Sequence, residues 1–213
     1  MEKLLTQIDD AIANCTRDLA ALTIQLINIK SLKSEPVPGG PFGAGCKQVL
    51  DTVMELGQKE GFYCTDYKVG VMHAALKPGQ PDLGIWLHGD VVPEGDDWLY
   101  PPYNATEKDG CIIGRGANDN KGQLAAMFLL LKIFKDLGVE LNYNPAIYVG
   151  SNEEFGMTDL IGDPSIPEAK GFLNVAAAPR MSLVPDSGFP VGYGGKGGMN
   201  ITIKSKTPLI SLK

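Results

Sequence analysis

The stretch Leu83-Gly84-Ile85-Trp86-Leu87-His88-Gly89-Asp90 sets the architecture of this chain, because it joins an apolar run directly to two polar side chains. The run 83–88 has the length of a strand that is buried in a core. At its end, His88 and Asp90 are separated by one residue and therefore project to the same side of an extended chain. These residues predict a buried strand whose end carries functional groups.

Three further segments place polar side chains at the ends of predicted strands or at the start of a helix. Strand 146–150 runs into Asn152-Glu153-Glu154, and strand 181–184 runs into Pro185-Asp186. Asp119 precedes the clearest amphipathic helix of the chain. Alternating strands and helices predict an α/β fold, with a mostly parallel central sheet and helices on both faces. In such folds, ligands collect beyond the carboxyl ends of the strands.

The remaining elements follow from hydrophobic spacing and from the positions of glycine and proline. Apolar residues recur at three- and four-residue steps from Leu4 to Leu26, so we expect one helix that ends before Ser31. The segment 34–45 contains three prolines and four glycines, which predicts a loop. The other predicted elements are helices at 48–61 and 122–137 and strands at 63–69, 71–76, 110–113 and 199–204.

Composition limits the classes of function. The chain has 213 residues, of which 44% are hydrophobic and 21% charged, and it can bury one α/β core with or without a small appendage. A net charge of −6 without any basic run argues against a nucleic-acid partner. The first residues contain no apolar segment of membrane or signal length, so we expect a cytoplasmic protein without membrane association. Its four dispersed cysteines form no C-x-x-C pair, and we expect buried, reduced thiols.

The polar residues at the strand ends suit a divalent metal, because one imidazole and several carboxylates are the donors of zinc and its first-row neighbours. Taken singly, each has a simpler interpretation: His88 as a hydrogen-bonded core histidine, Asp119 as a helix cap, Glu153-Glu154 as a solvated pair. Together they favour a two-metal hydrolase, with Asp90 accepting a hydrogen bond from the second ring nitrogen of His88. No Gly-x-Gly-x-x-Gly follows the first strand and no Gly-x-Ser-x-Gly occurs, which disfavours a dinucleotide fold and a serine hydrolase.

Four ordered motifs resemble those of the dinuclear zinc peptidase family that includes PepV-type dipeptidases, carboxypeptidase G, aminoacylases and the ArgE/DapE deacylases. The similarity covers most of the chain from Leu4 onward, and the last motif is most similar to the dipeptidase branch. The motifs are His88-Gly89-Asp90-Val91-Val92-Pro93, Gly114-Arg115-Gly116-Ala117-Asn118-Asp119-Asn120-Lys121-Gly122, Ser151-Asn152-Glu153-Glu154 and Pro185-Asp186-Ser187-Gly188-Phe189-Pro190.

This resemblance implies two Zn²⁺ ions, or alternatively Mn²⁺ or Co²⁺, bound by His88, Asp119, Glu154 and Asp186. His88 and Asp186 would bind one ion, Glu154 would bind the other, and Asp119 would bridge both. Glu153 would be the general base that takes a proton from a metal-bridging water and returns it to the leaving amine.

Three further expectations come from the same resemblance. Asp90 would orient His88, and the Asp119–Asn120 peptide would be cis, as is typical in the family. The family usually has an acid where Asn152 stands and often another where Asn120 stands, so the chain departs from the pattern at both positions.

The implied activity is hydrolysis of peptide or N-acyl amide bonds, with a dipeptidase favoured and a dipeptide or N-acyl amino acid as substrate. The alternative is a truncated, inactive fragment or pseudoenzyme that keeps the fold as a structural or binding module. Family members continue into a lid domain and later supply a last histidine ligand, which His73, upstream of the motifs, cannot match. We therefore expect residues 1–198 to be the N-terminal part of a catalytic domain, and 199–213 a final strand and the start of a connection to a lid domain that this chain lacks. The sequence leaves the oligomeric state open.

Overall fold

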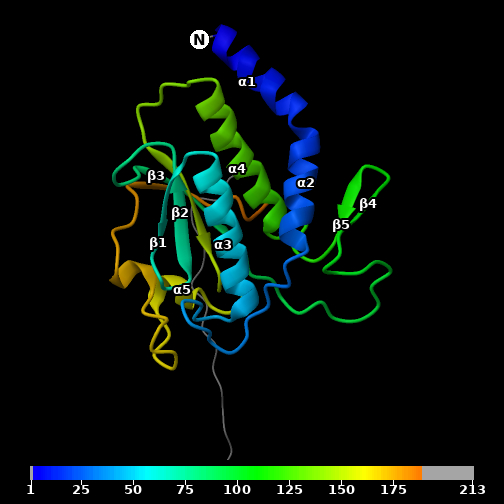
Figure 1. The fold of residues 1–213 in the computed structure, drawn as a ribbon, viewed down its shortest axis with the longest axis vertical. Helices are drawn as coiled ribbons and strands as arrows, with labels where there is room; N and C mark the ends of the chain where they lie inside the picture. The colour runs from blue at the N-terminus through cyan, green and yellow to red at the C-terminus, as the bar shows by residue number, and fades with distance from the viewer. Residues whose placement is uncertain (1, 189–213) are drawn as a thin grey trace, which may run out of the picture.

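A five-stranded sheet forms the centre of the fold in the computed structural model, which describes residues 2–188 (Figure 1). The order across the sheet is β1-β2-β6-β3-β7. β3 is parallel to both β6 and β7, whereas β2 is antiparallel to both β1 and β6, so four of the five strands point the same way. The predicted α/β class with a mostly parallel sheet is therefore confirmed. The strands are β1 (Tyr63–Asp66), β2 (Val71–Ala75), β3 (Leu83–His88), β6 (Pro145–Gly150) and β7 (Met181–Leu183).

One face of the sheet packs against two long helices, α3 (Ala44–Lys59) and α4 (Lys121–Asp136), and forms the main core. Side chains alternate along each strand, so every second residue of β2, β3 and β6 reaches this face. Phe62 and Phe128 meet there edge to face, with ring centroids 5.4 Å apart. The buried members of this core are Leu26, Ile29, Val49, Leu50, Val53, Phe62, Met72, Ala74, Ile85, Leu87, Leu124, Ala125, Phe128, Leu131, Ile147 and Val149.

The opposite face of the sheet is covered by short helical segments, α5 (Thr158–Ile161) and a 3₁₀ turn, η1 (Phe172–Asn174). Aromatic side chains fill this second core: the Trp86 and Tyr148 rings stack at 4.3 Å between centroids, and Phe172 packs edge-on against both. The sequence between Glu154 and Met181 carries no clear period, so these short elements were not predicted.

Two N-terminal helices, α1 (Glu2–Asn14) and α2 (Thr16–Ile27), extend along α4 (Figure 1). The prediction of one continuous helix is therefore wrong, because the helix is interrupted at Cys15. The side chains of Asn14, Cys15 and Thr16 donate hydrogen bonds to carbonyl groups about one turn earlier. Such local bonds compete with the regular helical pattern, and the apolar spacing does not report them.

The agreement with the predicted bounds is best where the apolar runs are longest. Strand β3 matches residue for residue, while α4 and β6 each begin one residue earlier than predicted. Helix α3 begins four residues earlier, at Ala44, inside the predicted loop. A separate hairpin of β4 (Thr106–Lys108) and β5 (Cys111–Ile113) contains one strand that was not predicted. The predicted strand 199–204 and the predicted boundary at residue 198 lie outside the described residues.

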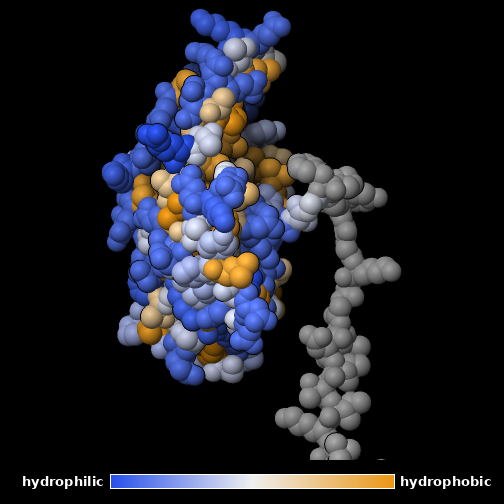
Figure 2. Space-filling view, turned by 90° about the vertical axis from the view of Figure 1, so that its right-hand side faces the viewer, coloured by the Kyte–Doolittle hydropathy of each residue, from blue (hydrophilic) through white to orange (hydrophobic). Residues whose placement is uncertain are grey.

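The surface seen in Figure 2 is mostly hydrophilic, with hydrophobic side chains in separate groups. Among residues 2–188, no helix combines the length and the apolar character needed to span a membrane. All four cysteines are free, as expected, but only Cys46 is buried and Cys111 is exposed. The expectation that all four are buried is therefore wrong, because Cys111 lies in the peripheral hairpin and not in the core.

Candidate metal centre

The polar motifs meet at one edge of the sheet because their strands are parallel neighbours. His88 is the last residue of β3, Glu153 lies three residues beyond β6, and Asp186 lies three residues beyond β7. The Gly89 N–H donates to the Gly150 carbonyl at 2.9 Å, which extends the β3–β6 pairing past the strand ends. The sheet therefore delivers these side chains to the position where α/β folds collect ligands.

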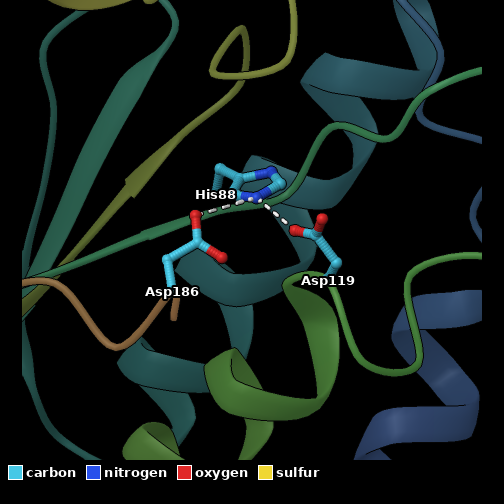
Figure 3. A group of neighbouring side chains, drawn as sticks. All are labelled: His88, Asp119 and Asp186. Carbon is cyan, nitrogen blue, oxygen red and sulfur yellow. Dashed lines mark hydrogen bonds and ion pairs between the residues drawn. The ribbon is translucent and has the colours of Figure 1, made fainter. Parts of the chain in front are cut away.

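Three of the predicted metal ligands converge on one point. The Nε2 atom of His88 lies 3.0 Å from Oδ1 of Asp119 and 3.5 Å from Oδ2 of Asp186 (Figure 3). One donor atom from each of the three residues lies within 4.8 Å of the others. The side chain of His88 is 2% exposed, that of Asp186 is 23% exposed and that of Asp119 is 60% exposed. The imidazole is therefore the most deeply buried of the three donors, and Asp119 faces the solvent.

Asp119 reaches this point from a tightly folded segment before α4. Gly116 has φ +90°, a conformation that L side chains rarely adopt. A Cβ atom on Gly122 would lie 2.3 Å from the Ala117 carbonyl oxygen, so only glycine fits there. The Asp119–Asn120 peptide is cis, as predicted.

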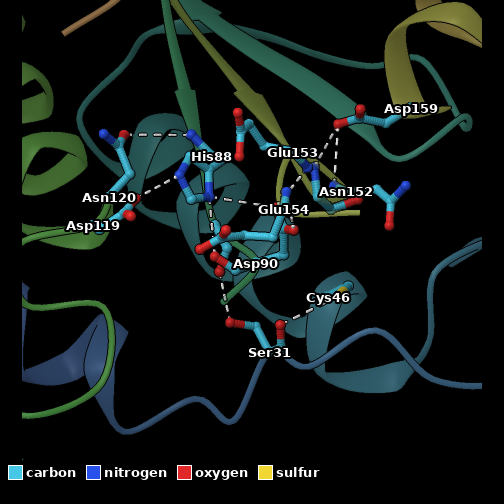
Figure 4. A network of polar contacts seen from close by, with 12 residues as sticks. Ser31, Cys46, His88, Asp90, Asp119, Asn120, Asn152, Glu153, Glu154 and Asp159 are labelled. Atoms are coloured by element: carbon cyan, nitrogen blue, oxygen red, sulfur yellow. Dashed lines mark hydrogen bonds and ion pairs between the residues drawn. The ribbon is translucent and has the colours of Figure 1, made fainter. Parts of the chain in front are cut away.

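Asp90 contacts His88 mainly through its main chain, which differs from the expected carboxylate contact. The Nδ1 atom of His88 lies 3.0 Å from the Asp90 carbonyl oxygen and 3.5 Å from its Oδ1. The fully buried Asp90 carboxylate accepts the main-chain N–H groups of Glu153, at 3.1 Å, and Glu154, at 3.2 Å (Figure 4). Asp90 thus links the histidine to the segment that carries the glutamates.

A second buried carboxylate completes the support of that segment. Oδ2 of Asp159 accepts the main-chain N–H groups of Ser151 at 2.8 Å and of Asn152 at 3.2 Å (Figure 4). Asp90 and Asp159 together therefore hold four consecutive N–H groups, those of residues 151–154. A Cβ atom on Gly150 would lie 2.4 Å from this Asp159 oxygen, which explains the glycine at the end of β6.

The two glutamates are half-buried and line two different pockets. Glu153 lines a pocket of about 290 Å³ together with His88 and Asp186, and its walls are mainly apolar. Glu154 lines a neighbouring cleft of about 400 Å³ with Asp119. Glu154 lies outside the set of donors within 4.8 Å of one another, so the structure brings together three of the four predicted ligands.

Electrostatics show that this cluster carries an excess of negative charge. Burial opposes a charge on His88, but Asp90, Asp186 and Glu153 outweigh it and raise its pKa to about 9. Burial, with the neighbouring aspartates, raises the pKa of Glu153 and Glu154 above their usual range. The carboxylates that favour a proton on His88 would equally favour a dication beside it. The nitrogen and oxygen donors present therefore fit a divalent metal such as Zn²⁺.

Two buried polar residues that sequence reasoning did not assign a role support the site. Asn120 is fully buried and contacts both the β3 and the Asp186 segments. Only its position directly after the predicted ligand Asp119 indicated in the sequence that Asn120 could lie at the site. Asp159 is 2% exposed, and burial together with Asp90 raises its pKa to about 6. Nothing in the local sequence distinguishes it from a surface aspartate.

Comparison with known proteins places these features in a family. The profile of "Peptidase family M20/M25/M40" matches residues 85–192, which is half of the chain and includes every predicted site residue. A Bacillus subtilis (strain 168) protein named "Putative dipeptidase YtjP" is 33% identical over 182 residues, covering 84% of this chain and 37% of that protein. A Staphylococcus haemolyticus relative, "Putative dipeptidase SH1171", is also 33% identical, over 83% of this chain and 35% of its own length. The chain thus spans little more than a third of the length of these relatives.

Solved structures share the fold. Human carnosine dipeptidase 1 superposes with a TM-score of 0.66 at 24% identity, over 86% of this chain and 41% of that one. The Saccharomyces cerevisiae di-peptidase Dug1p superposes with a TM-score of 0.65 at 20% identity, over 87% of this chain and 42% of that one. The match to the family profile, together with this fold, shows that the chain belongs to peptidase family M20/M25/M40.

Proposed function

We propose that this chain carries the metal-binding part of a hydrolase that cleaves peptide or N-acyl amide bonds, with a dipeptide as the favoured substrate. One observation carries the proposal: His88, Asp119 and Asp186 present donor atoms within 4.8 Å of one another at the ends of parallel strands. Three protein ligands with room for a further one are typical of catalytic zinc sites, whereas structural sites are closed. The names of the relatives support a dipeptide substrate.

His88 and Asp186 would hold one ion, Asp119 would contact both ions, and Glu154 would contribute to the second. A single imidazole among carboxylates suits Zn²⁺, which we favour over Mn²⁺ and Co²⁺. When bound, such ions polarise the scissile carbonyl group and make water more acidic.

Glu153 is the general base in this proposal. Its carboxylate borders the same pocket as His88 and Asp186, and its main-chain N–H is fixed by the buried Asp90. From there it accepts a proton from the attacking water and returns it to the leaving amine. Asp90 orients the His88 ring through the contact between its carbonyl oxygen and Nδ1.

A second candidate is a module that binds metal or a partner without catalysis. One observation favours it: Glu154 lies outside the converged group of donors among the described residues.

The test is hydrolysis by the full chain loaded with Zn²⁺ or Co²⁺. An unblocked dipeptide and an N-acetyl amino acid serve as substrates, because they separate a dipeptidase from a deacylase. We expect cleavage of the dipeptide, loss of activity with a chelator, and a decrease of about 10²- to 10⁴-fold in Glu153→Gln.

The matched control is Glu140→Gln, which makes the same change at an exposed position and should leave the rate unchanged. Zinc binding should persist in Glu153→Gln. A folded, metal-loaded chain that cleaves neither substrate would favour the non-catalytic module.

A further inference from the structure

Asn120 is a buried amide that connects three parts of the candidate site. Its Nδ2 atom donates to Oδ1 of Asp186 at 2.9 Å and to the Pro185 carbonyl oxygen at 3.1 Å. Its Oδ1 atom faces the main-chain N–H of His88 at 3.4 Å (Figure 4). Asn120 itself is fully buried and follows Asp119 directly. One side chain therefore contacts the segments of all three converged donors.

The chemistry of these neighbours fixes which end of the amide faces which segment. The Asp186 carboxylate and the Pro185 carbonyl are acceptors, so they require the NH₂ group. The His88 main-chain N–H is a donor, so it requires the amide oxygen. The amide therefore satisfies both sides in only one orientation.

The two carboxylate oxygens of Asp186 have different partners. Oδ1 accepts the hydrogen bond from Asn120, while Oδ2 is directed toward Nε2 of His88 at 3.5 Å. The Pro185 contact also fixes the main chain on which Asp186 sits. Asp186 reaches the site from a loop, three residues after the short strand β7.

We propose that Asn120 is a positioning residue that fixes Asp186 so that one carboxylate oxygen, Oδ2, is presented beside His88 to a divalent metal. This inference deepens the proposed function and rests on it. An amide suits the task better than the acid often found at this position in the family. An aspartate at position 120 would place a carboxylate against Asp186 and could donate only when protonated, whereas the amide always donates.

The experiment is a double-mutant cycle on Zn²⁺ affinity, measured by titration calorimetry on the full chain. Asn120→Ala should weaken Zn²⁺ binding about tenfold or more, as is typical when a partner of a metal ligand is removed. Asp186→Ala should weaken it at least as much. The double variant should bind no more weakly than Asp186→Ala alone, because Asn120 acts through Asp186.

Asn118→Ala is the matched control, since Asn118 is an exposed asparagine on the other side of Asp119 and should leave affinity unchanged. Asn120→Ser provides a second variant, which also removes the amide group but leaves a small polar side chain. The metal-free melting temperatures of all variants are measured alongside. A purely structural role would lower the melting temperature and add to the effect of Asp186→Ala.

The outcomes separate this inference from the proposed function. If the wild-type chain does not bind Zn²⁺, both are overturned. If Asp186→Ala weakens binding but Asn120→Ala and Asn120→Ser do not, only the role of Asn120 is overturned. Full additivity in the cycle, or failure of both Asn120 variants to fold, would also overturn it, because Asn120 would then support the fold and not Asp186 alone.

Discussion

The buried polar residues around the site divide into those that hold the backbone and those that face a ligand. The carboxylates of Asp90 and Asp159 accept main-chain N–H groups and are almost completely buried. Asp119 and Asp186 are partly exposed and converge on His88. Residue type alone does not separate these roles, since all four are aspartates, and burial and hydrogen bonding decide which oxygen atoms remain available to a metal.

Replacing Asp159 should therefore destabilise the fold. Asp159→Ala leaves the N–H groups of Ser151 and Asn152 without an acceptor, at a cost of about 1–3 kcal/mol for each buried group. Urea unfolding of the metal-free protein measures this loss. Asp9→Ala, the same change on the exposed surface of α1, should have almost no effect. Equal stability of the two variants would show that Asp159 does not hold this segment.

At the scale of whole elements, the strands and helices that cross the core were predictable from apolar periodicity, and the peripheral ones were not. β3 and α4 carry uninterrupted patterns, and their bounds were predicted to within a residue. The break at Cys15 and the strand β4 depend on local hydrogen bonds and on pairing with β5, which leave no apolar pattern. Hydrophobic spacing indicates which residues face a core. It does not indicate where a surface helix is interrupted or where a surface segment forms a hairpin.

The same limit applies to the candidate site. The order of the motifs, and the expectation that neighbouring parallel strands end together, predicted that His88, Asp119 and Asp186 lie close to one another, and the structure places them so. The placement of Glu154 outside the group and the main-chain contact of Asp90 depend on side-chain directions. The sequence pattern does not encode those directions residue by residue.

Helix α4 should contribute strongly to stability through its buried face. Leu124 is 1% exposed in the main core, whereas Leu99 is 91% exposed. Leu124→Ala should cost about 2–5 kcal/mol of unfolding free energy, because it removes buried methyl groups and leaves a cavity. Leu99→Ala removes the same atoms from a solvated position and should change stability by less than about 0.5 kcal/mol. Chemical denaturation compares the two, and similar losses would contradict the described core.

Strand β2 should make stability depend on pH through His73. Burial lowers the pKa of His73 to about 4, and its Nδ1 atom lies 2.7 Å from the Tyr67 hydroxyl. Between pH 6.5 and about 4, the unfolded chain binds a proton on this residue that the folded chain does not. Stability from His73 is therefore complete above pH 6.5 and is lost as the pH falls through this window.

The measurement compares urea unfolding of the wild type and His73→Gln at several pH values. Between pH 7 and pH 4, the free energy of unfolding of the wild type should fall by roughly 2–3 kcal/mol more than that of the variant. Contributions from other groups cancel in the difference. Parallel pH profiles for the two proteins would show that His73 titrates normally.

On the scale of the whole molecule, the chain carries a net negative charge, and negative charge is also concentrated in the candidate site. The net charge is −6, and five carboxylates gather around one imidazole where the strands end. Mutual repulsion in this cluster opposes folding without a cation, so a bound dication should stabilise the whole chain. Metal binding and folding stability are thus coupled by the same residues.

Zinc should therefore raise the melting temperature. At a free concentration near 100 times its dissociation constant, a ligand of the folded state adds about 2.7 kcal/mol, or roughly 5–10 °C for a chain of this size. A chelator should reverse the shift, and His88→Ala should abolish it. Thermal denaturation with and without Zn²⁺ measures the effect. A shift of equal size in His88→Ala would mean that zinc binds elsewhere.

The most direct test of the central claim is an anomalous difference map, measured at the zinc absorption edge, from crystals of the full chain soaked in Zn²⁺. We predict a peak in contact with Nε2 of His88 and with carboxylate oxygens of Asp119 and Asp186. Zinc found only at other side chains, or no zinc in well-soaked crystals, would contradict the assignment of this strand-end cluster as a metal centre.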